Sequence, residues 1–208
     1  MFIISGFLKV ANDLEWGAPS FAQHKNKSNR VRFISDFRNI NKQLNWKPYP
    51  MPKINEILLN WEGFQYATAL DLNMGSYHIL LSKNASKWCK MILPWGKYRY
   101  KRLPMGVANL PEIFQQKMSD LFNGFEFICA YIDDILILIK GDWIDYVQKL
   151  ELTLNKLKEK GLKRDIENYF FRKTEMEYLG LWVTRNGFKP INKKIEAITN
   201  MKPPTSQK

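Results

Sequence analysis

The spacing of apolar residues changes along the chain between the period of a helix and that of a strand. Helical spacing follows two prolines, Pro52 and Pro111, and proline is typical of the first turn of a helix. The apolar positions of the first predicted helix are Ile54, Ile57, Leu58 and Trp61. Those expected on the inner face of the second are Phe114, Met118, Leu121 and Phe122. Strands are predicted at residues 67–72 and at 97–102, where basic and aromatic side chains alternate.

Residues 125–139 form a near-continuous apolar run that is divided by two adjacent carboxylates, Asp133 and Asp134. Strands of about five residues on each side of this pair would form a buried hairpin. The carboxylates would then lie at the tip of the hairpin.

The strongest helical pattern begins at Trp143, and Gly161 should end it. Its expected apolar stripe consists of Trp143, Val147, Leu150, Leu154 and Leu157. Residues 178–184 predict one further strand, and Asn186-Gly187 predicts a hairpin turn after it. Since helices and strands follow one another without regular βαβ alternation, the expected fold class is α+β with a largely antiparallel sheet.

The chain is strongly basic, because its 208 residues include 32 Lys and Arg against 20 Asp and Glu, a net charge of +12. A hydrophobic content of 45% excludes a disordered tail and allows a substantial core. The excess positive charge favours a polyanionic partner, and alternating basic and aromatic residues suit phosphate contacts combined with base stacking. Nucleic acid is therefore the predicted partner, and a merely solvated basic surface is the alternative.

Two cysteines, Cys89 and Cys129, are too few for a disulfide framework and belong to no CxxC or Cys/His cluster. No apolar run reaches the roughly 20 residues of a membrane span, and the apolar N-terminal residues lack the other features of a signal peptide. We therefore expect an intracellular protein, in the cytoplasm or nucleus and not secreted, with no structural zinc and no membrane partner.

A third carboxylate, Asp71, also lies within a predicted apolar strand. Carboxylates of Asp71, Asp133 and Asp134 on neighbouring strands would make a hard-oxygen site suited to Mg²⁺, which completes its shell with water and phosphate oxygens. Two such ions could activate an attacking hydroxyl and stabilise a leaving pyrophosphate, which is nucleotidyl-transfer chemistry. For Asp133 and Asp134 alone, the alternative is a solvated turn, where aspartate is common.

Several motifs occur in a distinctive order along nearly the whole chain, and Tyr131-Ile132-Asp133-Asp134 matches the pattern YxDD. The others are Trp16-Gly17-Ala18-Pro19, residues 32–38, Pro50-Met51-Pro52, Leu70-Asp71-Leu72, Leu103-Pro104-Met105-Gly106, Phe114-Gln115 and Tyr178-Leu179-Gly180. In order and spacing they resemble the reverse transcriptases of gypsy-type LTR retrotransposons. The resemblance implies an RNA-directed DNA polymerase of right-hand fold: fingers at about 1–65 and 79–104, palm at about 66–78 and 105–190, and the start of a thumb or linker at 191–208.

The resemblance also implies roles for individual residues. Asp71, Asp133 and Asp134 would be catalytic and, with the backbone carbonyl of Leu72, would bind two Mg²⁺ ions, which Mn²⁺ could replace. The incoming dNTP would contact Lys25, Lys27, Arg32, Leu72, Ser76 and Gln115, with the choice between the two lysines left open. The primer and its RNA or DNA template would contact Asp36, Arg38, Met105, Gly106, Tyr131, Leu179 and Gly180. The resemblance leaves the oligomeric state open.

Three positions depart from the family pattern. Ser76 stands where the family carries an aromatic residue that excludes a ribose 2′-hydroxyl, and Tyr77 comes one residue later. If this segment is a strand, Tyr77 points away from the side of Ser76, and an active enzyme should discriminate poorly between ribo- and deoxyribonucleotides. Asn168 replaces a lysine that is a candidate proton donor to pyrophosphate, and Leu110 replaces a small residue.

These departures keep two alternatives open. The first is a nucleic-acid-binding retroelement remnant that folds like a polymerase but no longer catalyses. The second is a related RNA-templated RNA polymerase, which would explain Ser76 but not the series of motifs.

Overall fold

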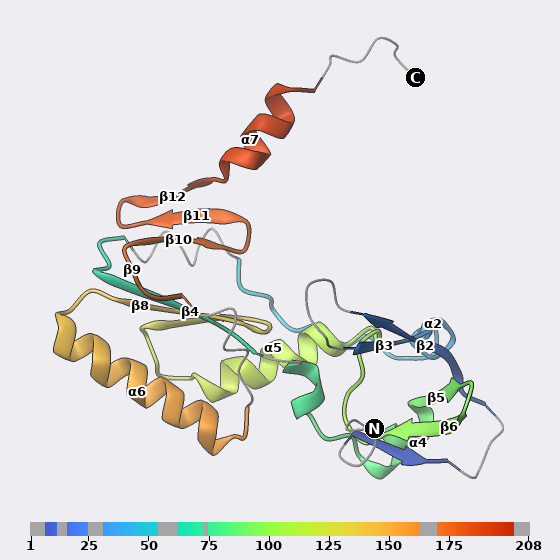
Figure 1. Cartoon of the computed structure of the whole chain (residues 1–208). Coiled ribbons are helices and arrows are strands. Elements are labelled where there is room, and N and C mark those ends of the chain that lie inside the picture. The colour runs from blue at the N-terminus through green and yellow to red at the C-terminus, as the bar shows by residue number, and fades with distance from the viewer. Residues whose placement is uncertain are drawn as a thin grey trace.

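The computed structural model describes residues 7–11, 16–24, 31–53, 62–72, 75–162 and 170–201. Their strands form three sheets in two lobes, with helix α5 (Leu110–Leu121) reaching from one lobe to the other (Figure 1). Helices and mostly antiparallel strands are mixed without βαβ repetition, so the expected α+β class is confirmed. The helix expected at 54–61, both candidate lysines Lys25 and Lys27, and Asn168 lie outside the described residues.

The first lobe, called here the five-stranded lobe, contains a sheet of strand order β1-β6-β5-β2-β3. Its elements are β1 (Leu8–Val10), β2 (Ala18–His24), β3 (Val31–Ser35), α2 (Arg38–Asn41), α4 (Lys83–Trp88), β5 (Lys90–Leu93) and β6 (Gly96–Tyr100). Among the described strands of this sheet, only β2 and β5 pair in parallel. Met91 and Leu93 are buried while Ile92 between them is exposed, so one face of this sheet is exposed to solvent.

The second lobe, called here the hairpin lobe, is built on an antiparallel sheet of order β7-β8-β4-β9. Its strands are β4 (Tyr66–Asp71), β7 (Ile128–Tyr131), β8 (Asp134–Ile139) and β9 (Phe170–Lys173). The isoleucines of β8 pack with α5 and α6, whereas Leu136 and Leu138 pack with a small second sheet. Because both faces of β8 are covered, residues 135–139 are apolar without alternation.

Two helices cover the isoleucine face of this sheet. Helix α5 buries Phe114 and Met118, as predicted, and Phe122 is buried just after its end. Helix α6 (Trp143–Glu159) ends shortly before Gly161, whose φ of +66° suits glycine at the end of a helix.

The predicted apolar stripe of α6 is wrong at its first two positions, because Trp143 and Val147 are 48% and 41% exposed. Tyr146 is buried instead, and its hydroxyl is 2.9 Å from the hydroxyl of Thr68 in β4. This contact brings a neighbouring side of the helix inward.

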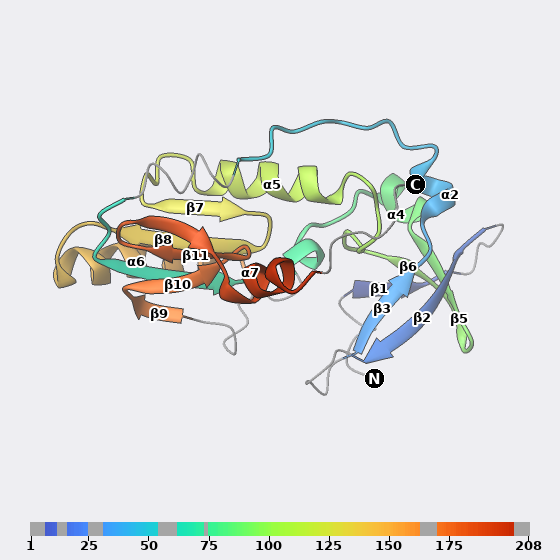
Figure 2. The same ribbon diagram turned by 90° about the horizontal axis from the view of Figure 1, so that it is seen from above.

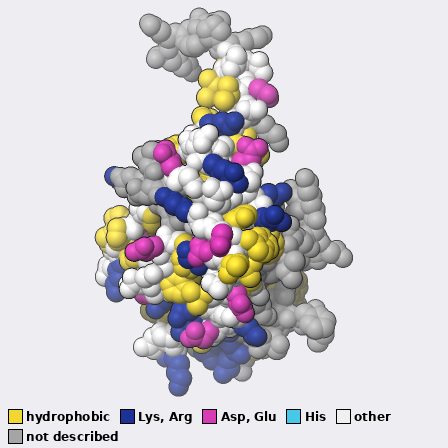
Figure 3. All heavy atoms as spheres, turned by 90° about the vertical axis from the view of Figure 1, so that its left-hand side faces the viewer, with side chains coloured by type: hydrophobic (Ala, Val, Ile, Leu, Met, Phe, Trp, Pro, Cys, Tyr) yellow, Lys and Arg dark blue, Asp and Glu magenta, His cyan; other side chains and the backbone are white. Residues whose placement is uncertain are grey.

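The second sheet of the hairpin lobe comprises β10 (Glu175–Tyr178), β11 (Leu181–Thr184) and β12 (Gly187–Pro190). The single strand expected at 178–184 is wrong, because Leu179 and Gly180 take φ values of +48° and +76° and reverse the chain between β10 and β11. The hairpin at Asn186-Gly187 is confirmed. Helix α7 (Asn192–Thr199) stands clear of both lobes with exposed apolar side chains (Figure 3).

An extended segment after α2 runs beside α5 toward the hairpin lobe (Figure 2). Trp46 Nε1 donates to Glu112 Oε1 at 3.1 Å, and Asn109 Nδ2 donates to the carbonyl of Asn45 at 2.9 Å. These bonds fasten the segment to the first turn of α5. Among the described helices, none has both the length and the apolar character needed to cross a membrane.

Candidate active site

The three candidate carboxylates meet at one end of the sheet in the hairpin lobe. Asp71, the last residue of β4, is paired across the antiparallel ladder with Asp134, the first residue of β8. Asp133 lies in the turn before β8, and its carbonyl accepts a hydrogen bond of 3.0 Å from the amide of Leu72. Residues opposite each other in such a ladder have Cα atoms about 5 Å apart. The fold therefore brings together residues that are more than sixty positions apart in sequence.

The turn that carries Asp133 is hydrogen-bonded to the buried side-chain amide of Gln115 in α5. Gln115, only 1% exposed, accepts a hydrogen bond of 2.7 Å from the amide of Ile132 and donates one of 2.9 Å to the carbonyl of Ala130. Ile132 has a φ of +52°, a conformation that costs free energy in a β-branched residue. The amide of Gln115 therefore stabilises this turn.

Replacing Gln115 with leucine should lower the free energy of unfolding by roughly 2 kcal/mol, because two partly buried backbone groups lose their partner. Urea unfolding measures this loss, and hydrogen exchange at the amide of Ile132 should accelerate. Gln116→Leu, on the exposed side of the same helix, is the matched control and should change stability by less than about 0.5 kcal/mol. Equal effects of the two substitutions would contradict the stabilising role of Gln115.

Negative charge is concentrated at this site. Burial raises the pKa of the Asp134 carboxyl to about 6, and the carboxylates of Asp71 and then Asp133 add to the effect. A cation would relieve this repulsion, and carboxylate oxygens are the ligands that Mg²⁺ prefers. In the described part of the chain, no three His, Cys, Asp or Glu side chains are arranged as a ready metal cage. The charge and donor type of these carboxylates suit Mg²⁺, whereas their arrangement among the described residues does not by itself form a complete site.

The segment after β4 differs from the expected strand, because residues Gly75–His78 form a 3-10 helix, η1. A Cβ atom at Gly75 would lie 2.8 Å from Cζ of Phe114 and 3.4 Å from Cβ of Asp133, so this backbone packs tightly beside the site. Ser76 is 5% exposed, and its hydroxyl has no hydrogen-bond partner among the described residues. Ser76, which departs from the family pattern, therefore directly follows Gly75, whose backbone packs beside the turn that carries Asp133.

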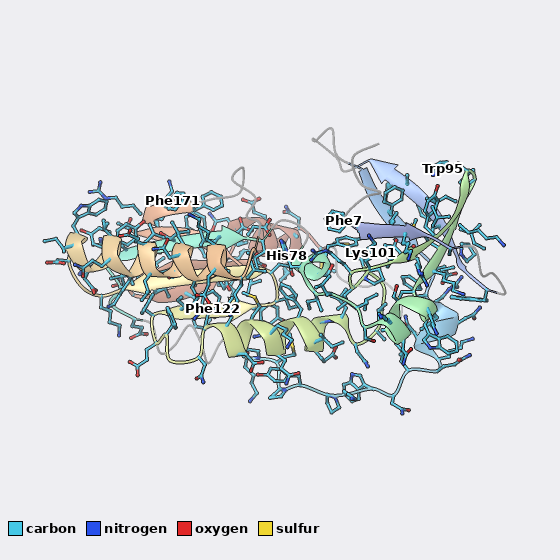
Figure 4. The ribbon with its side chains drawn as sticks, turned by 90° about the horizontal axis from the view of Figure 1, so that it is seen from below. Phe7, His78, Trp95, Lys101, Phe122 and Phe171 are labelled. Carbon is cyan, nitrogen blue, oxygen red and sulfur yellow. The ribbon has the colours of Figure 1, made fainter. Side chains whose placement is uncertain are left out.

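Tyr77 belongs to the five-stranded lobe rather than to the carboxylate site. Its ring lies 5.6 Å from that of Phe7 and 6.4 Å from that of Tyr100, measured between centroids. The expectation that Tyr77 points away from Ser76 assumed a strand, and this premise is wrong because η1 is helical. Packing against Phe7 and Tyr100 positions the ring of Tyr77 instead. Figure 4 shows Phe7, His78 and Lys101 gathered where the lobes meet.

A second group of predicted residues lies at the end of β3. The guanidinium of Arg38 donates two hydrogen bonds to Asp36 Oδ2, at 2.6 and 3.1 Å, and one of 2.9 Å to Oδ1. These bonds lower the pKa of Asp36 to about 2. Gly106, with a φ of +94°, approaches the carbonyl of Ser35 so closely that a Cβ would lie 3.4 Å from it. Asp36, Arg38 and the Met105-Gly106 loop are therefore neighbours in the structure.

The turn at Leu179-Gly180 is connected to the carboxylate site through the side chain of the preceding residue, Tyr178. Leu179 and Gly180 form the turn after β10, and the hydroxyl of Tyr178 donates to the carbonyl of Asp134 at 3.2 Å. Tyr131 pairs with Asp134 across the hairpin. Arg32 lies in β3 opposite Gln23, and its side chain is outside the described part.

Known proteins match this chain in both sequence and structure. The family model "Reverse transcriptase (RNA-dependent DNA polymerase)" matches residues 23–183. The Pol polyproteins of the Drosophila melanogaster transposons opus and gypsy are 34% and 32% identical over 88% and 80% of this chain. The chain spans only 18% and 16% of their lengths.

Solved structures of a foamy viral protease-reverse transcriptase share the fold at 22% sequence identity. The complex with dsDNA has a TM-score of 0.84 over 96% of this chain and 41% of that one. The complex with an RNA/DNA hybrid has a TM-score of 0.81 over 96% and 26%. With the family model covering most of its length, the chain belongs to the reverse transcriptase (RNA-dependent DNA polymerase) family.

Proposed function

We propose that this chain is the fingers and palm of an RNA-directed DNA polymerase that adds dNTPs to a primer by two-metal nucleotidyl transfer. The observation that carries the proposal is the ladder register, which sets Asp71 opposite Asp134 with Asp133 in the adjoining turn. Because the chain spans less than a fifth of the opus and gypsy polyproteins, the activity of those whole proteins is a proposal here.

The carboxylates of Asp71, Asp133 and Asp134 and the carbonyl of Leu72 would hold two Mg²⁺ ions, or Mn²⁺ in their place. Bound there, the ions would supply charge neutralisation for the attacking 3′-hydroxyl and the leaving pyrophosphate. The chain's own contribution is geometric. Gln115 and Tyr178 bond to the backbone on both sides of the acidic turn and so keep the carboxylates in register.

In this proposal the five-stranded lobe is the fingers and the hairpin lobe is the palm. Lys25 or Lys27, together with Arg32, would bind the triphosphate, and Ser76 would face its sugar. The Asp36–Arg38 pair and the Met105-Gly106 loop would contact the template, and the Leu179-Gly180 turn and Tyr131 the primer. The foamy viral enzyme forms complexes with dsDNA and with an RNA/DNA hybrid, which supports these partners.

Primer extension decides between this function and a binding remnant. Purified protein, an oligo-dT primer on poly-rA, dTTP and Mg²⁺ should yield extended primer, and EDTA should abolish the product. Binding of the same duplex without any extension, in Mg²⁺ and in Mn²⁺, would favour the remnant, for which Asn168 is the motivating observation.

Nucleic-acid affinity should fall linearly with salt concentration on a log–log plot, by roughly 0.7–0.9 for each phosphate neutralised. Fluorescence anisotropy of a labelled primer–template measures the slope. Arg38→Gln should reduce the slope by about one phosphate, since its exposed guanidinium is a proposed template contact. Lys189→Gln, in the exposed part of β12, is the control and should leave the slope unchanged. An affinity insensitive to salt would count against both the polymerase and the remnant.

A further inference from the structure

A preformed apolar cavity lies in the five-stranded lobe, where that lobe meets the start of α5, apart from the carboxylate site. It has a volume of about 330 Å³. From the five-stranded lobe it is lined by Ile40 and Leu44 at the end of α2 and by Ala85, Trp88 and Cys89 around α4. Val107, Asn109 and Ile113 close it from the loop before α5 and from the helix itself. Cavities of this size are at the lower end of those that bind small organic molecules.

One polar group in the cavity wall has an unused hydrogen-bonding atom. Asn109 is 8% exposed, and its Nδ2 donates to the carbonyl of Asn45. That bond fixes the orientation of the amide, so Oδ1 is the remaining acceptor. Among the described residues Oδ1 is buried and has no hydrogen-bond partner. A buried acceptor without a partner costs free energy, which a ligand donor at this position would recover.

The wall around Asn109 is held in place independently of any ligand. Asn41 Nδ2 donates to the carbonyl of Gly106 at 2.8 Å, and Asn41 Oδ1 accepts from the amide of Ala108 at 2.9 Å. This pair of bonds ties α2 to the loop that carries Val107 and Asn109. A preformed wall lowers the cost of ordering on binding.

We propose that this cavity binds a small planar aromatic molecule that carries one N–H donor. The aliphatic side chains that line the cavity favour a ligand with an apolar ring. The indole of Trp88 also lines the cavity, and because it is 63% exposed it offers an aromatic surface to the ligand. The N–H would bond to Asn109 Oδ1. A molecule seated there contacts α2, α4 and the first turn of α5 at once. The proposal is independent of polymerase activity, because binding needs neither nucleic acid nor metal.

Cysteine footprinting on the unmodified chain tests the site, with indole as the probe. Cys89 lines the cavity, whereas Cys129 is equally buried in the core beneath β10, and each has its thiol pKa raised by burial to about 11. Indole should slow modification of Cys89 by methyl methanethiosulfonate at least about threefold at concentrations well above half saturation, by simple occupancy of the site. Modification of Cys129 should be unchanged. Equal slowing of both thiols would mean general stabilisation and would overturn the proposal.

The donor is tested with 1-methylindole, which keeps the ring but lacks the N–H. It should bind about fivefold more weakly than indole in the same footprint, because it leaves Asn109 Oδ1 without a partner. Affinity equal to that of indole would remove Asn109 from the proposal. Both measurements use the natural chain and so do not depend on the folding of a variant.

Two alanine substitutions locate the site. Ala85→Leu puts additional volume into the cavity and should abolish protection of Cys89 by indole. Ala108→Leu is the same change at an exposed neighbouring position and should leave protection intact. Persistent protection in a folded Ala85→Leu variant would place indole elsewhere and refute the cavity assignment.

Discussion

Asp133→Asn should reduce primer extension by at least about a thousandfold, the scale seen when a single catalytic carboxylate is removed. Asparagine has nearly the same shape but lacks the negative charge that would hold a metal ion. Asp71→Asn should have the same effect, because its residue lies across the ladder from the acidic pair. Single-turnover extension rates measure the loss, and primer–template affinity should change by less than about threefold, since phosphate contacts supply most of that affinity.

Asp120→Asn is the matched control for this experiment. Asp120 is an exposed residue of α5 outside the carboxylate site, and its substitution should leave the extension rate unchanged. Thermal unfolding of each variant separates a loss of catalysis from a loss of fold. An Asp133→Asn protein that still extends primers at close to the natural rate would refute the catalytic assignment.

Ser76→Tyr should raise the preference for dNTPs over rNTPs by about 10- to 100-fold, the penalty expected when a filled site must accommodate an additional hydroxyl. The serine side chain is short, and it follows Gly75, whose backbone packs against Phe114 and close to Asp133. In the proposed function, an aromatic ring at position 76 would lie beside the sugar and exclude its 2′-hydroxyl. The natural chain should therefore discriminate poorly, and the ratio of incorporation efficiencies for a matched dNTP and rNTP measures this.

Tyr77→Phe separates the two neighbouring positions. Tyr77 packs against Phe7 and Tyr100 in the five-stranded lobe, so removal of its hydroxyl should leave the sugar preference unchanged. A strong preference for dNTPs in the natural chain, unaltered by Ser76→Tyr but lost on substitution of Tyr77, would make Tyr77 the residue that excludes the 2′-hydroxyl.

Local patterns along the chain were sufficient to predict strands that are buried on both faces and turns that require glycine. The hairpin around Asp133-Asp134 was predictable because both faces of β8 are covered, and such a strand must be apolar throughout. Asn186-Gly187 and Gly161 were predictable because positive φ selects glycine. The family was also predictable, because the order and spacing of its motifs are properties of the linear chain.

Features that depend on contacts between distant segments were decided only by the tertiary structure. The spacing of apolar residues locates the buried stripe of a helix only to within about one residue around its axis. The bond between Tyr146 and Thr68 selects which side of α6 is buried. Leu179 adopts positive φ against its own preference, because β10 and β11 must pair on both sides of it. The role of Gln115 is also invisible locally, since its partners Ala130 and Ile132 lie on another element. Short-range preferences are properties of a few adjacent residues, whereas these outcomes are set by packing between segments that meet only in the folded chain.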